Sequence, residues 1–302
     1  MSNLIPDPIV IDSPLRAEAN GRSTQLRRRW PCFRLRGRVL LIVSGAVLLL
    51  TFLTFLLAPV IAPFGPNAQG TGLPFAGPSS AHWFGTDELG RDLFTRVLYG
   101  GALSCEIAIG ATTLAVALGV LWGFTAAMRG KLLDEILMRA ADIVMAIPVI
   151  LLALIFISGF GGNRWSLIVV IGLLLSPSTA RMARSIALTE TSRDYYSAAV
   201  AYGAGWWRLT LHEIFPNARQ PLVAMAVINA ANAILLEASL SFLGLGIQPP
   251  QESLGSLLQE GFQFLYNAGT YLIFPALIIV VLIWSLNVFA DQLALNSDRR
   301  AL

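Results

Sequence analysis

Long apolar runs alternate with shorter polar segments along most of the chain. The runs have about the length of a helix that crosses the hydrocarbon core of a bilayer, roughly 20 residues. This pattern predicts six membrane-spanning helices, at Val39–Ile61, Leu103–Met128, Ala140–Ser158, Ser166–Ala183, Leu222–Leu245 and Tyr271–Ala290. The fourth is short and contains Pro177, so we expect a kink there, with neighbouring helices satisfying the freed carbonyl groups.

Composition places the chain in the same class. Hydrophobic residues make up 55% of the 302 residues and charged residues 13%, whereas soluble domains carry about 25% charged residues. The mean hydropathy is +0.67. We therefore expect an all-α, polytopic membrane protein. The basic residues flank the apolar runs and do not form one soluble face, which argues against a nucleic-acid partner.

The distribution of arginine and lysine predicts the orientation, because cytoplasmic segments of membrane proteins are rich in both. With the N-terminus inside, the inner segments hold 18 of the 21 basic residues, and the outer segments hold only Arg91, Arg96 and Arg164. Both termini are then cytoplasmic. The predicted organisation is a disordered basic tail at 1–38, a first, uncleaved helix at 39–61, an outer loop at 62–101, a core of five helices at 102–293 that contains an inner loop at 184–221, and a tail at 294–302.

The outer loop is rich in glycine and proline, and a second outer segment, the outer hairpin, follows the fifth helix at 246–270. Leucines and phenylalanines at helical spacing predict a short helix from Glu252 to Leu265 that lies at the membrane interface. The outer loop also contains His82 and Asp87, but with no second histidine or cysteine nearby we expect no metal site there. The cysteines, Cys32 and Cys105, are far apart and are expected to be unpaired.

Ionisable residues inside the apolar runs are few: Glu106, Asp142 and Glu237, with Asp291 close to an end. Ion-coupled carriers use such residues as relays, so their scarcity favours transport powered from elsewhere. We expect Glu237 to have a helix-packing role. No glycine-rich phosphate loop and no nucleophile–base pair stands out in the sequence, so the chain is not expected to be an enzyme or to bind ATP itself.

The inner loop combines aromatic residues with helical spacing and two glycines. Residues such as Tyr195, Tyr202 and Trp206 form one apolar stripe, which predicts helices on both sides of an elbow at Gly203 and Gly205. We expect Pro216 to end the second helix. From these residues alone, two interpretations stay open: docking into a groove of a partner protein, or an amphipathic helix on the lipid surface.

Several motifs resemble permease subunits of bacterial ATP-binding cassette (ABC) importers. The inner loop carries the spacing Ala198, Ala199, Gly203, His212 and Pro216. The family-specific stretches are His82-Trp-Phe-Gly-Thr-Asp87-Glu-Leu-Gly-Arg91-Asp92, Met138-Arg-Ala-Ala-Asp142 followed by Ile147-Pro148, and Ala238-Ser-Leu-Ser-Phe-Leu-Gly-Leu-Gly-Ile-Gln-Pro-Pro250. Over about residues 38–292, the chain is similar to the second permease subunit of dipeptide and oligopeptide importers.

The resemblance implies the fold of a type I ABC importer permease in the bacterial inner membrane. Its implied partners are a second permease subunit, two ATP-binding subunits and an extracytoplasmic solute-binding protein. The implied ATPase coupling loop contains Ser197, Ala198, Ala199, Gly203, Trp206, His212 and Pro216. The implied outer gate and binding-protein surface contains Gly85, Thr86, Asp87, Gly90, Arg91, Asp92, Gln248, Pro249 and Pro250.

The sequence departs from the family pattern in two places. Ser197 stands where the family usually has a glutamate, which puts one contact with the ATPase in doubt. Near the C-terminus Asp291 is kept, but the usual glycines and arginine are absent. Alternatives at this point are transport of nickel or metal chelates by the same type of transporter, an ion-coupled carrier that acts alone, and a membrane scaffold without transport activity.

Overall fold

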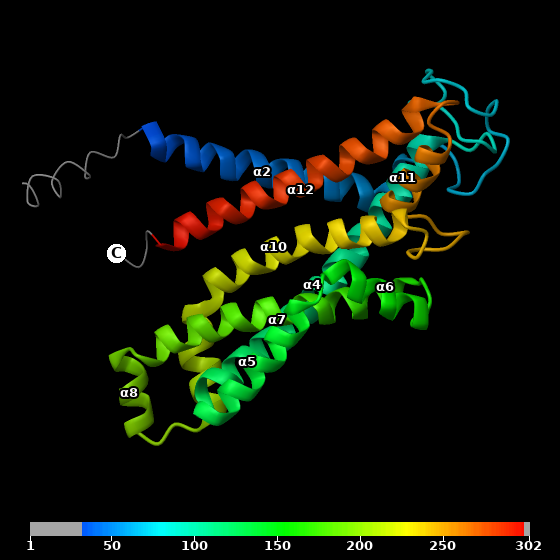
Figure 1. Ribbon diagram of the computed structural model, residues 1–302. Coiled ribbons are helices and arrows are strands. Elements are labelled where there is room, and N and C mark those ends of the chain that lie inside the picture. The colour runs from blue at the N-terminus through cyan, green and yellow to red at the C-terminus, as the bar shows by residue number, and fades with distance from the viewer. Residues whose placement is uncertain (1–31, 299–302) are drawn as a thin grey trace, which may run out of the picture. The chain divides into compact units, whose positions relative to one another are not determined.

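The computed structural model describes residues 32–298, and side chains within 39–295 (Figure 1). The chain divides into two units at Val39, and the described part of the first unit is the start of α2. The described residues form helices joined by loops, with one isolated bridge between Thr86 and Asp92. The helices are α2 (Cys32–Leu56), α3 (Ala58–Ile61), α4 (Leu93–Met128), α5 (Lys131–Ala146), α6 (Val149–Phe160), α7 (Arg164–Thr191), α8 (Asp194–Ala201), α9 (Trp206–Arg208), a π-helical segment (Leu209–Ile214), α10 (Phe215–Phe242), α11 (Leu254–Gln263) and α12 (Gly269–Asp298).

Five helical stretches are long and apolar enough to cross a membrane, and α5 with α6 supplies a sixth if the two form one span. This agrees with the prediction of a polytopic helical membrane protein. The third span is not the continuous helix expected at Ala140–Ser158, because α5 and α6 meet at an angle of 87°. Ile147 precedes Pro148 and is extended (φ −91°, ψ 133°), since the proline ring disfavours helical geometry in the residue before it.

Several predicted boundaries are wrong by a few turns. Helix α4 begins at Leu93 and not at Leu103, because the carboxylate of Asp92 accepts the N–H of Thr95 at 2.8 Å and so caps the helix. The outer loop therefore ends at residue 92. Part of the predicted N-terminal tail is helical, from Cys32, while the disorder expected for residues 1–31 lies outside the described residues. Helix α12 likewise continues into the predicted C-terminal tail.

Helices α4 and α7 pack backbone to backbone in the core. A Cβ atom on Gly119 would lie 2.5 Å from Thr179 Cβ, and one on Gly123 would lie 2.3 Å from the carbonyl oxygen of Ala180. Small residues at such positions let helices approach closely, which replaces the hydrophobic driving force that is lacking between helices in lipid. The Gly-x-x-x-Gly spacing in α4 thus fixes its contact with α7.

Pro177 lies within α7 without ending it. A proline cannot donate to the carbonyl four residues earlier, which here belongs to Leu173. The hydroxyl of Ser176 donates to that carbonyl oxygen at 2.8 Å. The freed group is therefore satisfied from within α7, and not by a neighbouring helix as we expected.

Helix α10 is held to α4 through Glu237, whose side chain is fully buried. Ser104 of α4 donates to one carboxylate oxygen at 2.8 Å, and Ser241 donates to the other at 2.7 Å. This is the helix-packing role predicted for Glu237. At its other end α10 follows the π-helical segment directly, so Pro216 does not end a helix as predicted but lies in the first turn of α10.

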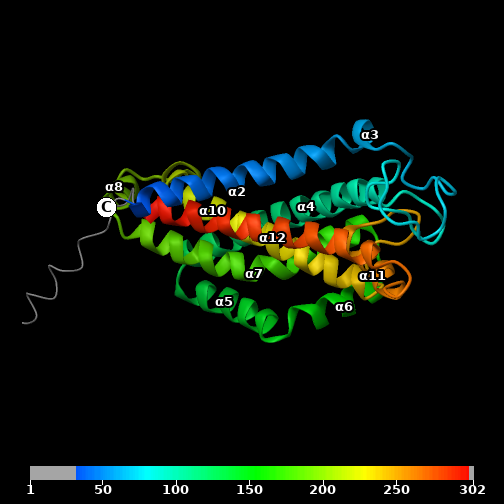
Figure 2. The ribbon, with the colours of Figure 1, turned by 90° about the horizontal axis from the view of Figure 1, so that it is seen from above.

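Within the unit Leu40–Leu302, the α8–α9 segment and the outer loop lie at opposite ends of the long helices (Figures 1 and 2). The outer loop and α11 gather at one end, beside the start of α4 and α12. Segments expected on opposite sides of a membrane are therefore separated by the length of the spans.

Candidate functional site

The outer loop is folded against itself through backbone contacts. Gly85 and Gly90 have φ angles of +86° and +67°. A Cβ atom on Gly85 would lie 2.4 Å from the carbonyl oxygen of Ala76, and one on Gly90 would lie 2.3 Å from that of Gly72. Only glycine fits either position. Thr86 adds to the fold by accepting the N–H of Ala76 at 2.9 Å.

Asp87 organises the turn that leads into α4. One of its carboxylate oxygens accepts the N–H groups of Leu89 and Arg91, at 2.8 and 2.9 Å. The other accepts from the guanidinium groups of Arg91 and Arg96, with 2.6 Å to Arg96 Nη1. Asp87 is fully buried and both its oxygens accept hydrogen bonds, so it has a structural role in the loop.

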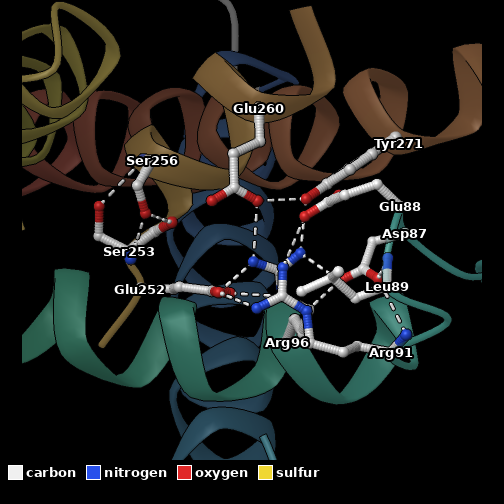
Figure 3. A network of polar contacts seen from close by, with 10 residues as sticks. All are labelled: Asp87, Glu88, Leu89, Arg91, Arg96, Glu252, Ser253, Ser256, Glu260 and Tyr271. Atoms are coloured by element: carbon white, nitrogen blue, oxygen red, sulfur yellow. Dashed lines mark hydrogen bonds and ion pairs between the residues drawn. The ribbon is translucent and has the colours of Figure 1, made fainter. Parts of the chain in front are cut away.

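Arg96 connects the outer loop to the outer hairpin (Figure 3). Its side chain is fully buried and comes from the first turns of α4. It donates to Asp87 of the outer loop, to both carboxylate oxygens of Glu252, to Glu260 of α11 at 2.8 Å, and to the hydroxyl of Tyr271 at the start of α12. One guanidinium group thus holds three separate segments together.

The Arg96 network contains more acidic groups than basic groups. Four carboxylates, those of Asp87, Glu88, Glu252 and Glu260, surround two guanidinium groups. Burial raises the pKa of Glu252, while its hydrogen bonds with Arg96 act in the opposite direction. Tyr271 donates its hydroxyl to the same Glu260 oxygen that accepts from Arg96.

Both ring nitrogens of His82 make hydrogen bonds. Its Nδ1 is 2.9 Å from a carboxylate oxygen of Asp92, and its Nε2 is 3.2 Å from the carbonyl oxygen of Thr71. Within the part of the chain that the structure describes, no group of three potential metal ligands occurs. The ring therefore links the outer loop to the N-cap of α4.

Five of the nine residues assigned to an outer contact surface are buried, and Arg91 is partly buried. Gly85, Thr86, Asp87, Gly90 and Asp92 therefore shape the loop from within, and their assignment to an outer gate stays a prediction. The sequence motif pointed to them because the turn needs those residue types. Gln248, Pro249 and Pro250 are exposed, and the outer loop and outer hairpin also expose the apolar side chains of Leu73, Trp83, Leu89 and Tyr266.

Helix α11 is packed against the protein and does not lie freely at the membrane interface. Leu254 and Leu257 are fully buried. A reciprocal capping box between Ser253 and Ser256 starts the helix. The predicted leucine spacing was right, and Leu254 and Leu257 are buried in a helix that packs against α4, α10 and α12, whereas Phe262 and Leu265 are exposed.

The inner loop contains the turn that the glycines predicted. Helix α8 ends at Ala201 and α9 begins at Trp206. Gly203 has a φ of +77°, and a Cβ atom there would meet open space, as it would at Gly205. Only the backbone angle therefore requires glycine at 203, while Gly205 has an ordinary angle (φ −71°).

The expected aromatic stripe of the inner loop divides into two sets. Tyr195 and Trp206 are partly buried, and the guanidinium carbon of Arg129, which follows α4, lies 4.9 Å from the centre of the Trp206 ring. Tyr202 points outward and is 92% exposed. The exposed large apolar side chains of the inner loop and the start of α10 are those of Val200, Tyr202, Trp207, Leu211 and Phe215, which we call the exposed apolar face of the inner loop.

The remaining residues predicted for the coupling loop lie around this face. Ser197, Ala198, His212 and Pro216 are exposed, and Ala199 is partly buried. None of them approaches the outer residues, so the structure separates the predicted site residues into two groups at opposite ends of the spans (Figure 2).

Two ion pairs hold α5, the first half of the broken third span, to α7 near the inner loop. Arg184 binds Asp134, and Arg181 binds Asp142. The pair with Asp142 is half exposed. Asp142 is therefore a partner of an arginine and not a buried relay.

Comparisons with known proteins agree with this arrangement. The model of a family described as binding-protein-dependent transport system inner membrane component matches residues 115–302. A putative peptide permease protein of Brucella suis biovar 1 is 37% identical over 262 residues, which cover 86% of this chain and 87% of that protein. A probable D,D-dipeptide transport system permease protein of Escherichia coli K12 is 33% identical over 267 residues, or 88% and 90% of the two chains.

A dipeptide transport system permease protein of Alkalihalophilus pseudofirmus is 33% identical over 254 residues, or 84% of this chain and 82% of that protein. Among solved structures, an inward-facing form of the MetNI methionine ABC transporter aligns with a TM-score of 0.53 and 20% identity. The alignment covers 67% of this chain and 95% of that chain. This structural likeness concerns the fold alone.

Proposed function

The chain belongs to the family of binding-protein-dependent transport system inner membrane components, and from this premise we propose that it is one of two permease subunits of an ABC importer. It is a multi-pass membrane protein and a transport component, not an enzyme. In this proposal it lies in the bacterial cytoplasmic membrane with both termini inside, in agreement with its arginine distribution.

The observation that carries the proposal is the exposed apolar face of the inner loop. Large side chains such as Tyr202 and Trp207 stand on short helices between two spans, α7 and α10. Exposed apolar groups gathered in one place are typical of a protein contact. We assign this face to an ATP-binding subunit, so that ATP is bound by the partner and no cofactor by this chain.

The outer end suits a second contact, with a solute-binding protein. Gln248, Pro249 and Pro250 are exposed on the outer hairpin, and Trp83 is exposed on the outer loop. Both segments are joined through Arg96, so a protein bound to either would act on α4, α11 and α12 together. We propose that these segments form the binding-protein surface and the outer gate.

The proposed cargo is a di- or oligopeptide, because the relatives with the highest similarity described above are named for peptides or dipeptides. The pathway would lie between this subunit and a second permease. Two ATPase subunits would bind at the inner loops of the two permeases and drive them between inward-open and outward-open states.

Co-purification tests whether this chain assembles with an ATP-binding subunit and a second permease. An affinity tag on this chain should retain an ATP-binding subunit and a second permease from membranes of the source organism. The pair Trp207→Asp and Leu211→Asp should abolish retention of the ATPase, while Arg164→Gln at the other end should not. Retention of the ATPase by the double variant, or transport by the purified chain alone, would contradict the proposal.

Crosslinking tests the outer contact. A photoreactive residue in place of Gln248 or Trp83 should crosslink to the solute-binding protein encoded nearest to this chain. The same residue in place of Tyr202 should crosslink to the ATPase and not to the binding protein. Labelling of the Gln248 position from the cytoplasmic side alone would refute the orientation.

A further inference from the structure

Helix α8, the first helix of the proposed ATPase contact, is weakly attached to the rest of the protein. None of its eight residues is buried. Two adjacent tyrosines make its contacts with the ends of the spans. The ring of Tyr196 packs against an apolar cluster that includes Phe124, Ala183 and Ile214, and the hydroxyl of Tyr195 makes polar contacts.

The Tyr195 hydroxyl lies between the ends of two membrane spans. It donates to a carboxylate oxygen of Glu190, in the last turn of α7, at 2.5 Å. It accepts from the side-chain amide of Asn217, in the first turn of α10, at 3.2 Å. The carboxylate of Glu190 is nearly buried and is also paired with Arg193 at 3.1 Å. One hydroxyl group thus joins α8 to both α7 and α10.

The protonation state suits this role. Burial, followed by the hydrogen bond with Glu190, raises the pKa of Tyr195 to about 12. A tyrosine hydroxyl keeps its proton at neutral pH even without this shift, so it can donate to a carboxylate while it accepts from an amide. A hydrogen bond to a charged acceptor is stronger than one between neutral groups.

The contact at Asn217 lies just after a change in helix type. The amide of Asn217 also donates to the carbonyl oxygen of Glu213 at 2.8 Å, and Glu213 belongs to the π-helical segment Leu209–Ile214. The backbone bonding changes there from π-helical to α-helical, and π-helical turns are frequent at functional sites. A force on Tyr195 is therefore delivered to the point where α10 begins its regular bonding.

We propose that Tyr195 is the positioning residue through which a displacement of α8 moves the inner ends of α7 and α10 together. This inference rests on the proposed function, because the displacement is the one that the ATPase would impose. Tyr195 lies two residues before Ser197 in α8. The exposed side chain of Ser197 takes no part in the contact of Tyr195 with Glu190 and Asn217.

The test uses the complete transporter, purified through a tag on this chain and placed in nanodiscs. A fluorophore on Tyr266→Cys, at a fully exposed position of the outer hairpin, reports movement at the outer end, with Cys32→Ser and Cys105→Ala in the background. ATP hydrolysis and the ATP-driven change of the fluorescence are measured on the same sample. The matched control is Tyr196→Phe, which removes the hydroxyl of the neighbouring tyrosine and keeps its ring.

Tyr195→Phe is expected to keep assembly and ATP hydrolysis within about twofold, while the fluorescence change falls about fivefold or more, the lower end of ordinary coupling between sites. Tyr196→Phe is expected to keep both. Glu190→Gln and Asn217→Ala should each reproduce part of the loss. Combining either with Tyr195→Phe should add little, because the partners share one contact.

A full fluorescence change in Tyr195→Phe would overturn the inference and leave the proposed function intact. If Tyr195→Phe fails to assemble, full responses in both Glu190→Gln and Asn217→Ala overturn it equally, because both partners of the hydroxyl are then dispensable. An unchanged chain that retains no ATPase, or shows no ATP-driven change at all, contradicts the proposed function itself.

Discussion

The outer end and the inner loop are built in opposite ways. At the outer end a fully buried guanidinium, that of Arg96, holds the outer loop, α11 and the start of α12 by charged hydrogen bonds. In the inner loop, α8 has no buried residue and is joined to the spans through the hydroxyl of Tyr195 and the ring of Tyr196.

The difference indicates which segments can move on their own. Segments that share one buried charge move as one body, because separating them would leave that charge without partners in a place that water does not reach. A helix with an exposed surface and few contacts can be displaced at small cost. The outer segments therefore behave as one rigid piece, and the inner loop as the element that a partner can push or pull.

Removal of the buried guanidinium is the strongest test of this comparison. Arg96→Leu leaves Asp87, Glu252 and Glu260 facing one another, and should lower the free energy of unfolding by about 3–5 kcal/mol. Arg164→Leu removes an arginine that pairs with Glu106 at a half-exposed position, and should cost at most about 1 kcal/mol.

Thermal unfolding of the two variants in detergent measures this difference. A far lower Tm for Arg96→Leu than for Arg164→Leu supports a rigid outer end. Equal Tm values would show that the Arg96 network does not hold the outer segments together.

The turn in the inner loop offers a test with an intermediate effect. Gly203→Val places a β-branched residue at a φ of +77°, which costs about 1–2 kcal/mol. The turn should change its path, and because about 1.4 kcal/mol changes an equilibrium tenfold, ATP-driven uptake of radiolabelled dialanine into vesicles should fall about tenfold. Gly205→Val is the matched control, because its side chain also meets open space and its backbone angle is ordinary.

Gly205→Val should keep uptake within about twofold, since no strain is introduced. Complexes of both variants should still contain the ATPase, which co-purification checks. Equal uptake by the Gly203 and Gly205 variants would mean that the left-handed turn is not needed for coupling.

The smallest expected effect concerns alkaline pH. The pKa of Tyr195 is raised from 10.0 to about 12 in the folded protein, so the folded inner loop keeps a proton that the unfolded chain releases. The stabilising contribution of this hydroxyl is complete below about pH 10 and is lost as the pH rises through about 12. Limited proteolysis of the inner loop across this range should therefore accelerate with pH.

Tyr195→Phe should flatten that acceleration, while Tyr202→Phe, which removes an exposed hydroxyl, serves as the control. If the cleavage rates of the unchanged chain and Tyr195→Phe rise in parallel, the Tyr195 hydroxyl does not hold the loop.

Much of the fold could be predicted, because spanning helices must carry long apolar runs and those are visible in the sequence. Helix ends were less accurate. Capped by Asp92, α4 begins ten residues before the apolar run that marked the predicted span, and the cap was missed because it is a single side chain within a polar stretch. The break at Pro148 has a signal in the sequence, the Ile147–Pro148 pair. The prediction from hydropathy nevertheless treated the residues on both sides of this pair as one continuous span.

The turn of the inner loop was predictable because its information is local: Gly203 lies between two short helical patterns within a few turns of it. The outer network was not. Arg96 meets Glu252, Glu260 and Tyr271 at sequence separations of 156, 164 and 175 residues. The sequence does show an arginine, Arg96, near the start of a span and two carboxylates, Glu252 and Glu260, in the outer hairpin. Hydropathy does not indicate which of these charged groups pair.

The 87° break between α5 and α6 has a consequence for biosynthesis. Helix α6 has 12 residues and is about 18 Å long at the usual rise per residue, which is short of the roughly 30 Å hydrocarbon core. Helix α5 carries charged side chains such as Asp134 and Arg139 along its length. Neither half is a good substrate for the insertion machinery by itself. We therefore expect this part of the chain to insert stably only after α7 is made, because Arg184 and Arg181 of α7 bind Asp134 and Asp142, respectively.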